Sequence, residues 1–518
     1  MPSRALPVTM TTRVKSFGNC STDTCEESHQ KSPNASKWRI FASNTTLHGL
    51  RQVVRNESSF FKRFIWFLFL CTAAGTYCYL STISVTKYFS RPIKTVISQE
   101  ASSNGLKFPA VTICNLNFFM KSKIDTAEED ENFVKLGLNI TGCSDREFRR
   151  VRGNLTCGQA LLCAFDWFGY AIVRGCNKTV RQNIVEALNR SSERIFSQEE
   201  FLTRYGHNIT DMFLLYCRFM KTTECSVEDF VPKLTESGIC YTFNSGEKSP
   251  VLRTLFEGPD LGLNILLDVQ TNESTMADFS HGFKVIVHDQ DTFVNRHIGF
   301  NIPPGFHAAV AVKLRKHIRL PKPYKTKCRQ EKLPGIGTYT KDGCISQCLA
   351  NMTLTRCGCR TIAMLQGQTD APLCSMREIN CLVKTESEIG EDNLSACSCS
   401  NACTELEYET RVSYSKFPDN SIIDILHNIF GKKESSSYMR ENYVFLQVGF
   451  QHLAYEKRED VPSYKLESLL GEFGGNMGLF LGCSLLTLCE FLDFVWAAVT
   501  SRMRRRSVEI SPSTGTIS

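Results

Sequence analysis

Apolar residues gather into two long stretches of the 518-residue chain, and elsewhere they alternate with polar ones. The first stretch, residues 64–86, carries no charge and lies between Lys62-Arg63 and Lys87. A helix of this length crosses the hydrocarbon layer of a membrane, which is about 30 Å thick. We therefore predict a first transmembrane helix at residues 63–86. The polar residues before it contain no signal peptide, so this helix is expected to direct the chain to the membrane.

The second apolar stretch is shorter and is followed by two acids. Residues 473–489 are uncharged, and apolar residues continue past Glu490 and Asp493. A buried core helix is one interpretation of such a run. The flanking charges favour a second transmembrane helix, at residues 471–500.

Basic residues flank both stretches on the sides away from the centre of the chain. Arg51, Arg55, Lys62 and Arg63 precede the first stretch, and residues 502–506 contain four arginines. Segments on the cytoplasmic side of membrane helices are enriched in Lys and Arg. This pattern places residues 1–62 and 501–518 in the cytoplasm and residues 87–470 outside the cell, in a plasma-membrane protein.

Composition adds information only through the cysteines. The chain is 42% hydrophobic and 22% charged, as in a soluble protein of two or more domains. However, 18 of its 24 cysteines lie between Cys114 and Cys403. An even number at this density indicates disulfides formed in an oxidising compartment. Zinc is the alternative at Cys357-Gly-Cys359 and Cys397-Ser-Cys399, but zinc ligands usually have wider spacing.

The predicted extracellular segment also contains eight Asn-x-Ser/Thr glycosylation acceptors. They are Asn139, Asn154, Asn177, Asn189, Asn208, Asn272, Asn351 and Asn393.

Within this segment, strands are predicted at residues 108–114, 265–270 and 283–288. Residues 196–232 and 419–440 have helical periodicity. The tails, residues 1–40 and 507–518, are predicted to be disordered.

The second apolar stretch contains the candidate chemistry. Its glycines recur four residues apart, in the rows Gly471-Gly475 and Gly474-Gly478-Gly482. Such spacing lets helices approach closely, which within one chain is simple packing. Acids at membrane depth usually line a watery path. Two crossings cannot enclose a pore, so several chains around a rotational axis are expected, with a ring of carbonyls and carboxylates that attracts cations.

Residues 469–494 closely resemble the pore helix of the degenerin, epithelial sodium and acid-sensing ion channel family. The resemblance extends over residues 41–505. It includes Thr46-Leu-His-Gly-Leu50, the strand at 108–117, the segment 240–246 and the cysteines from Cys328 to Cys403.

The resemblance implies an α+β membrane protein that forms a trimeric channel. Each subunit would have two transmembrane helices and a disulfide-rich extracellular domain, with a β-sheet palm and ball and a helical finger (118–235), thumb (328–405) and knuckle. Seven disulfides are implied by position: Cys114-Cys240, Cys217-Cys225, Cys328-Cys403, Cys344-Cys399, Cys348-Cys397, Cys357-Cys381 and Cys359-Cys374. Two further bonds are expected among Cys143, Cys157, Cys163 and Cys176, with partners left open.

The resemblance also implies roles in the pore. Gly482, Cys483 and Ser484 would form the selectivity filter, where Cys483 departs from the commoner alanine or serine. Gly471 would occupy the position at which bulky side chains hold such pores open. The remaining pore or gate residues would be Glu472, Gly475, Gly478, Glu490, Asp493 and the re-entrant pair His48 and Gly49.

Several segments of the sequence bear on which ligand opens the channel. Proton-gated members have paired histidines and an acidic stretch where this chain has Arg91-Pro-Ile93 and Thr271-Asn-Glu273. Tyr324 replaces the usual wrist tryptophan, with Arg91 facing it. Residues 405–418 and 438–442 look more like the peptide-gated and bile-acid-sensitive branch. The expectation is a sodium-selective, amiloride-blocked channel opened by an FMRFamide-like neuropeptide. Proton or bile-acid gating is the alternative.

One candidate peptide site lies in the finger, although an aromatic cluster beside disulfides is more often a small core. Its apolar residues are Leu161, Leu162, Phe165, Trp167, Phe168 and Tyr170.

Two other classes of protein share parts of this pattern. A two-pass glycosylated receptor without conduction would not need Glu490 and Asp493 in a span. An ectoenzyme would need a nucleophile or metal motif, and neither Gly-x-Ser-x-Gly nor His-Glu-x-x-His occurs. We expect no catalysis, cofactor, metal or nucleic-acid partner. The expected partners are sodium ions, a peptide ligand, membrane lipids and two further subunits, identical or related.

Overall fold

The computed structural model divides the chain into two compact units, Met1–Ser90 with Lys465–Ser518, and Arg91–Tyr464. The structure describes residues 37–47, 49–55, 58–125, 146–165, 173, 175–191, 198–235, 238–274, 280–295, 297–360, 371–372, 374, 378, 381–382, 384–385, 397–430 and 434–509.

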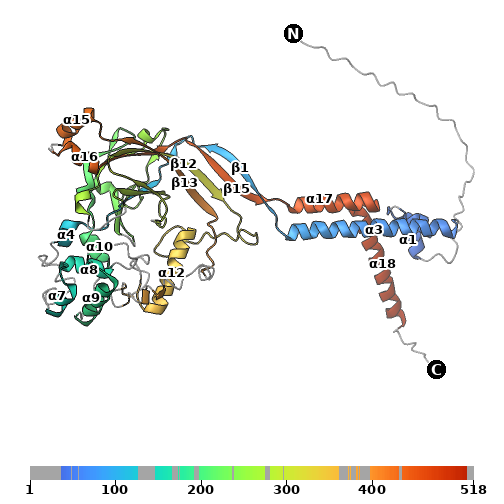
Figure 1. The fold of residues 1–518 in the computed structure, drawn as a ribbon. Coiled ribbons are helices and arrows are strands. Elements are labelled where there is room, and N and C mark those ends of the chain that lie inside the picture. The colour runs from blue at the N-terminus through green and yellow to red at the C-terminus, as the bar shows by residue number, and fades with distance from the viewer. Residues whose placement is uncertain are drawn as a thin grey trace, which may run out of the picture. The chain divides into compact units, whose positions relative to one another are not determined.

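The first unit is helical (Figure 1). Its elements are α1 (Lys37–Asn44), α2 (Leu50–Val54), α3 (Phe60–Phe89), α17 (Leu466–Asn476), a π-helical turn η6 (Met477–Leu481) and α18 (Leu485–Glu509). Only α3 is by itself long and apolar enough to cross a membrane among the described helices. None of its apolar window is buried, unlike a core helix of a soluble protein. A second such segment exists if Leu466–Leu481 and Leu485–Thr500, bent by 76°, are taken together.

The second unit is built on two main sheets. The larger has the order β1-β15-β12-β14-β9-β4-β5, and β13 pairs with β12. In it, β12 runs parallel to β14 and β15, and the other strand pairs are antiparallel. The strands are β1 (Ile93–Ala101), β15 (Ala454–Pro462), β12 (Phe306–Ile318), β14 (Tyr443–Phe450), β9 (Leu263–Asp268), β4 (Phe213–Phe219), β5 (Thr223–Glu224) and β13 (Thr404–Lys416).

The second sheet is antiparallel, with the order β11-β10-β3-β7-β6. One apolar core joins the two sheets, and it includes Val111, Phe243 and Val285 of this sheet and Ile265 and Leu446 of the larger one. Burial of such surface is the main favourable contribution to folding. The strands are β11 (Phe300–Ile302), β10 (Phe283–His288), β3 (Ala110–Asn115), β7 (Gly238–Phe243) and β6 (Phe230–Thr235), and a small separate pair is β2 (Leu106–Lys107) with β8 (Arg253–Thr254).

Helices gather beside the sheets (Figure 1). One group has its own core, which includes Leu155, Ile184 and Tyr205. Among the described residues of the second unit, the α-helices are α4 (Lys121–Asp125), α7 (Arg146–Arg152), α8 (Cys157–Phe165), α9 (Lys178–Ser191), α10 (Gln198–Tyr205), α11 (Ile209–Met212), α12 (Lys341–Cys357), α15 (Asn420–Phe430) and α16 (Ser436–Asn442).

Disulfides link these elements. Seven of them join the same pairs of cysteines that the family resemblance implied. Cys163 is bonded to Cys176, and Cys157 is also in a disulfide. Cys143 lies outside the described residues. The cysteines considered for zinc, Cys357, Cys359, Cys397 and Cys399, are therefore all oxidised.

The predicted strands are confirmed as β3, β9 and β10, and the helical periodicity of 419–440 as α15 and α16. The helical prediction for 196–232 is wrong beyond Met212, because the chain there forms β4, β5 and the start of β6. The predicted disorder is also wrong at residues 37–40, which belong to α1, and at 507–509, which end α18. The outer parts of both tails lie outside the described residues.

Candidate functional site

The second apolar helix is broken at the predicted filter. The turn η6 ends at Gly482, whose φ of 59° lies in the left-handed region. Glycine adopts this conformation without the steric cost that a Cβ imposes, and it commonly ends helices in this way. Residues 482–484 are not helical, and α18 begins at Leu485. The regular helical hydrogen bonding is therefore interrupted between η6 and α18.

Two side chains of this tract differ in exposure. Cys483 is a buried free thiol, and its Sγ lies 3.9 Å from the carbonyl oxygen of Met477. Ser484 is exposed in the single chain. Ser484, rather than Cys483, is thus accessible from outside the chain.

Ser484 is held by the first turn of α18. Its backbone N–H donates to Oγ1 of Thr487 over 3.1 Å, and its carbonyl oxygen accepts from the Thr487 N–H over 3.0 Å. Thr487 Oγ1 also lies 2.5 Å from Oγ1 of Thr46, and either atom can be the donor. Sequence reasoning missed Thr46 and Thr487 as site residues. The signal for Thr487 was its spacing, three residues after Ser484, as in a helix capping box.

The glycine rows before the break face open space within the single chain. A Cβ added at Gly471, Gly474, Gly475 or Gly478 would meet no atom within 4 Å. Packing inside this chain therefore does not require these glycines.

The three acids of this region lie in different surroundings. Glu472 accepts a hydrogen bond of 2.6 Å from the Ser84 hydroxyl of α3, and Ser84 is buried. Glu490 and Asp493 are exposed on α18. Ser84 is a further residue that the sequence reasoning did not single out.

The N-terminal segment packs on the same helices. Phe41 of α1 stacks on Phe494 of α18, with ring centroids 4.4 Å apart. Gly49 has φ of 87°, and a Cβ there would lie 3.7 Å from Trp66 of α3. His48 lies outside the described residues. The segment before the first apolar helix thus contacts both α3 and α18.

Within the second unit, Arg91 and Tyr324 meet as expected. The guanidinium carbon of Arg91 lies 5.9 Å from the centroid of the Tyr324 ring, which is a cation–π distance. Tyr324 belongs to the loop between β12 and Cys328, and Arg91 precedes β1.

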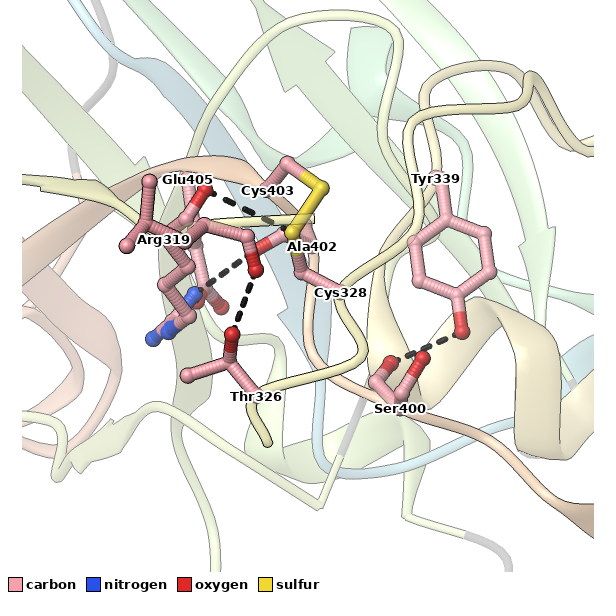
Figure 2. Close-up of a disulfide and its surroundings, with 9 residues drawn as sticks. Arg319, Thr326, Cys328, Tyr339, Ser400, Ala402, Cys403 and Glu405 are labelled. Atoms are coloured by element: carbon pink, nitrogen blue, oxygen red, sulfur yellow. Dashed lines mark hydrogen bonds and ion pairs between the residues drawn. A yellow bond between two sulfur atoms is a disulfide. The ribbon is translucent and has the colours of Figure 1, made fainter. Parts of the chain in front are cut away.

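The Cys328–Cys403 disulfide closes the base of the cysteine-rich segment (Figure 2). Beside it, Arg319 donates to the Ala402 carbonyl over 2.9 Å and pairs with Glu405 over 2.6 Å. Tyr339 donates to the Ser400 carbonyl over 2.8 Å. These contacts fix the end of β12 to the start of β13.

One position that departs from proton-gated members, Thr271, makes neutral hydrogen bonds. Asn442 accepts from both the N–H and the hydroxyl of Thr271, over 2.6 and 2.8 Å. Nearby, the buried His207 contacts Asn117 and Gln270, each over 2.9 Å. Burial lowers the pKa of His207, so its neutral form is favoured.

The apolar finger site is only partly described. Leu162 is buried in the core of the α7–α9 helices, as expected for a core residue. Trp167, Phe168 and Tyr170 lie outside the described residues, as do the side chains of Leu161 and Phe165.

Five of the eight glycosylation acceptors have exposed side chains, as attachment of a glycan requires: Asn154, Asn177, Asn208, Asn272 and Asn351. Asn139, Asn393 and the side chain of Asn189 lie outside the description.

The chain is similar in sequence to known ion channels along most of its length. Acid-sensing ion channel 2 of Rattus norvegicus is 31% identical over 496 residues, which cover 93% of this chain and 90% of the relative. Acid-sensing ion channel 1C of Danio rerio is 29% identical over 486 residues, covering 91% and 86%. The family model described as amiloride-sensitive sodium channel matches residues 41–494. The chain therefore belongs to the amiloride-sensitive sodium channel family.

Proposed function

We propose that this protein is one subunit of a trimeric, ligand-gated and sodium-selective channel of the plasma membrane. The observation that carries the proposal is the break at Gly482-Cys483-Ser484, between an apolar helix rich in glycine and a helix that bears exposed Glu490 and Asp493. As a member of a sodium channel family, the chain is expected to transport ions rather than catalyse a reaction.

The proposed topology has two crossings. Helix α3 is the first, and α17, η6 and α18 together form the second. Residues 87–470 lie outside the cell, and both termini are cytoplasmic. Disulfides and exposed glycosylation acceptors support this assignment, because both modifications belong to the oxidising side of the membrane.

The pore forms where three copies meet. One chain exposes Ser484, Glu490 and Asp493 without enclosing them. Three copies around a rotation axis would convert each residue into a ring. Hydroxyl and carbonyl oxygens at 482–484 would replace water around the ion, and the carboxylates would attract cations. Glu472, bound to Ser84, would line the outer part of the path with Gly475 and Gly478.

Opening follows from differential binding. A ligand that binds the open arrangement of the extracellular domain more tightly than the closed one shifts the population toward the open state. Arg91, which contacts Tyr324, comes just after α3 in the sequence, so this contact lies at the start of the extracellular domain.

Two gating ligands have specific support. An amidated FMRFamide-like peptide is favoured by the resemblance of residues 405–418 and 438–442 to the peptide-gated and bile-acid-sensitive branch. Protons are favoured by the relatives, which are named acid-sensing ion channels. Arg91-Pro-Ile93 and the neutral contacts of Thr271 weigh against proton gating by the usual groups.

The test is current from cells that express this chain alone, with surface delivery measured in parallel. Amidated peptides, acid and bile acids are applied in turn, sodium is replaced by potassium, and amiloride is added. We expect a ligand-evoked, amiloride-blocked current whose reversal potential follows the sodium gradient. If the chain reaches the surface and neither it nor its combinations with related subunits conducts, a non-conducting receptor is the better interpretation.

A further inference from the structure

The first turn of α18 has an inverted pattern of burial. Leu485, Leu486 and Leu488 are exposed, with Leu485 and Leu486 more than 70% exposed, whereas the polar Thr487 is only 6% exposed. Burial of a hydroxyl is unfavourable unless it forms hydrogen bonds. Thr487 is therefore buried for its contacts rather than for its apolar surface.

Those contacts join two segments that are 441 residues apart. Thr487 Oγ1 accepts from the backbone N–H of Ser484 over 3.1 Å and lies 3.5 Å from the Ser484 hydroxyl. On its other side it meets Thr46 Oγ1 at 2.5 Å. Each hydroxyl has one proton to donate and can accept twice, so all three contacts can be satisfied together.

The arrangement corresponds to half of a capping box. In that motif the third residue of a helix reaches back to the N–H of the capping residue, usually through Glu or Gln. Here Thr487 takes this position and Ser484 is the capping residue. A short, β-branched threonine has few rotamers, so it fixes the Ser484 backbone more closely than a long side chain would.

We propose that Thr487 is a positioning residue for ion selection. Its hydroxyl sets the position of Ser484 and joins it to Thr46. In this way the N-terminal segment beside Gly49 supports residues 482–484. This inference rests on the proposed function of residues 482–484 as the selectivity filter.

The test compares isosteric and conservative variants of the full-length channel. Thr487→Val keeps the shape and removes the hydroxyl, whereas Thr487→Ser keeps the hydroxyl. The readout is the Na⁺/K⁺ permeability ratio from reversal potentials, with surface protein measured by biotinylation. We expect Thr487→Val to lower the ratio roughly two- to tenfold, as for the loss of one hydrogen bond, and Thr487→Ser to retain it.

Thr46 supplies the second arm. Thr46→Val should lower the ratio in the same direction, with recovery in Thr46→Ser. The double valine variant should be no less selective than Thr487→Val alone, because partners in one contact are not additive. Thr46 lies outside α18, so this arm decides the question if Thr487→Val does not reach the surface.

The outcomes separate the two levels of the proposal. A wild-type chain that reaches the surface and passes no sodium-selective current contradicts the proposed function. A selective wild type whose ratio is unchanged in Thr487→Val, or in Thr46→Val where only that variant is delivered, overturns the positioning role.

Discussion

At the scale of single residues, glycine and small hydroxyl side chains determine the candidate site. Gly482 permits the left-handed turn that ends η6, and Ser484 directly precedes the next helix, with its N–H bound to Thr487. The glycine row identified the region but not the break, because Gly474 and Gly478 have similar surroundings in sequence and remain helical.

Enlarging the side chain at position 484 tests the location of the proposed selectivity filter. Ser484→Leu should abolish the current or bring the Na⁺/K⁺ permeability ratio toward one, because three bulky side chains would meet where the hydroxyls lie. Leu486→Phe, on the exposed face of α18, is the control and should conduct normally. Unchanged conduction in Ser484→Leu would place the filter elsewhere.

Enlarging Gly471 tests the gate. A Cβ there would meet nothing within 4 Å in one chain, so we expect the effect of a bulky side chain to arise between copies. We expect Gly471→Phe to give a standing inward current without ligand, measured as the current that amiloride removes. Leu470→Phe adds a ring at an exposed neighbour and should stay closed. Closed behaviour of Gly471→Phe would contradict this assignment.

Acidification should destabilise the fold through His207. Burial lowers its pKa below the usual value of 6.5, so the unfolded state binds more protons than the native state as pH falls through and below that value. The contribution is present above pH 6.5 and is lost below it. Lys123, which lowers the His207 pKa, and Glu273 and Asp211, which raise it, surround the ring.

Thermal unfolding of the full chain in detergent, at about pH 7.5 and about pH 5.5, measures this effect. His207→Gln keeps an amide that can contact Asn117 and Gln270 and should reduce the loss of stability on acidification. The exposed His452→Gln is the control. Burial also lowers the pKa of the partly buried His288, so part of the loss remains. An identical pH dependence in His207→Gln and wild type would contradict the assignment.

At the scale of elements, the sequence correctly predicted those strands and helices that depend on the local pattern of apolar residues. The strands β3, β9 and β10 are buried apolar runs, and α15 and α16 follow the helical period. The prediction failed at β4, where pairing with β9 and the Cys217–Cys225 bond impose a hairpin on a sequence of mixed periodicity. Tertiary contacts of this kind override local propensity. The Thr46–Thr487 contact was likewise invisible, because the partners are far apart in sequence.

The disulfide ladder gives a prediction at this scale. With Cys344–Cys399 intact, the Cys328–Cys403 bond closes an effective loop of about 20 residues, whereas Cys348–Cys397 adds a loop of only about six inside it. Replacing the outer pair by serine should therefore lower the unfolding temperature more than replacing the inner pair. The outer bond is worth about 3 kcal/mol on loop entropy alone. The unfolding temperature is measured on the full chain. If replacing the inner pair lowers it as much as replacing the outer pair, or more, native contacts outweigh loop closure.

At the scale of the whole molecule, the proposed function requires several copies. Packing within one chain does not explain the glycines that face open space, the exposed Ser484 or the exposed acids of the apolar helix. They become coherent if the second crossings of three chains surround water and ions. The family could be identified from the sequence, whereas the gating ligand depends on differences between two states that a single arrangement does not contain.

The most direct test of the central claim is current through purified protein. The chain alone is reconstituted into a planar bilayer at known oligomeric state, and amidated peptide or acid is applied to the extracellular side. We predict unitary, amiloride-blocked currents whose reversal potential follows the sodium gradient and whose ion preference is lost in Ser484→Leu. Intact trimers that never conduct, or sodium current unaffected by Ser484→Leu, would contradict this claim.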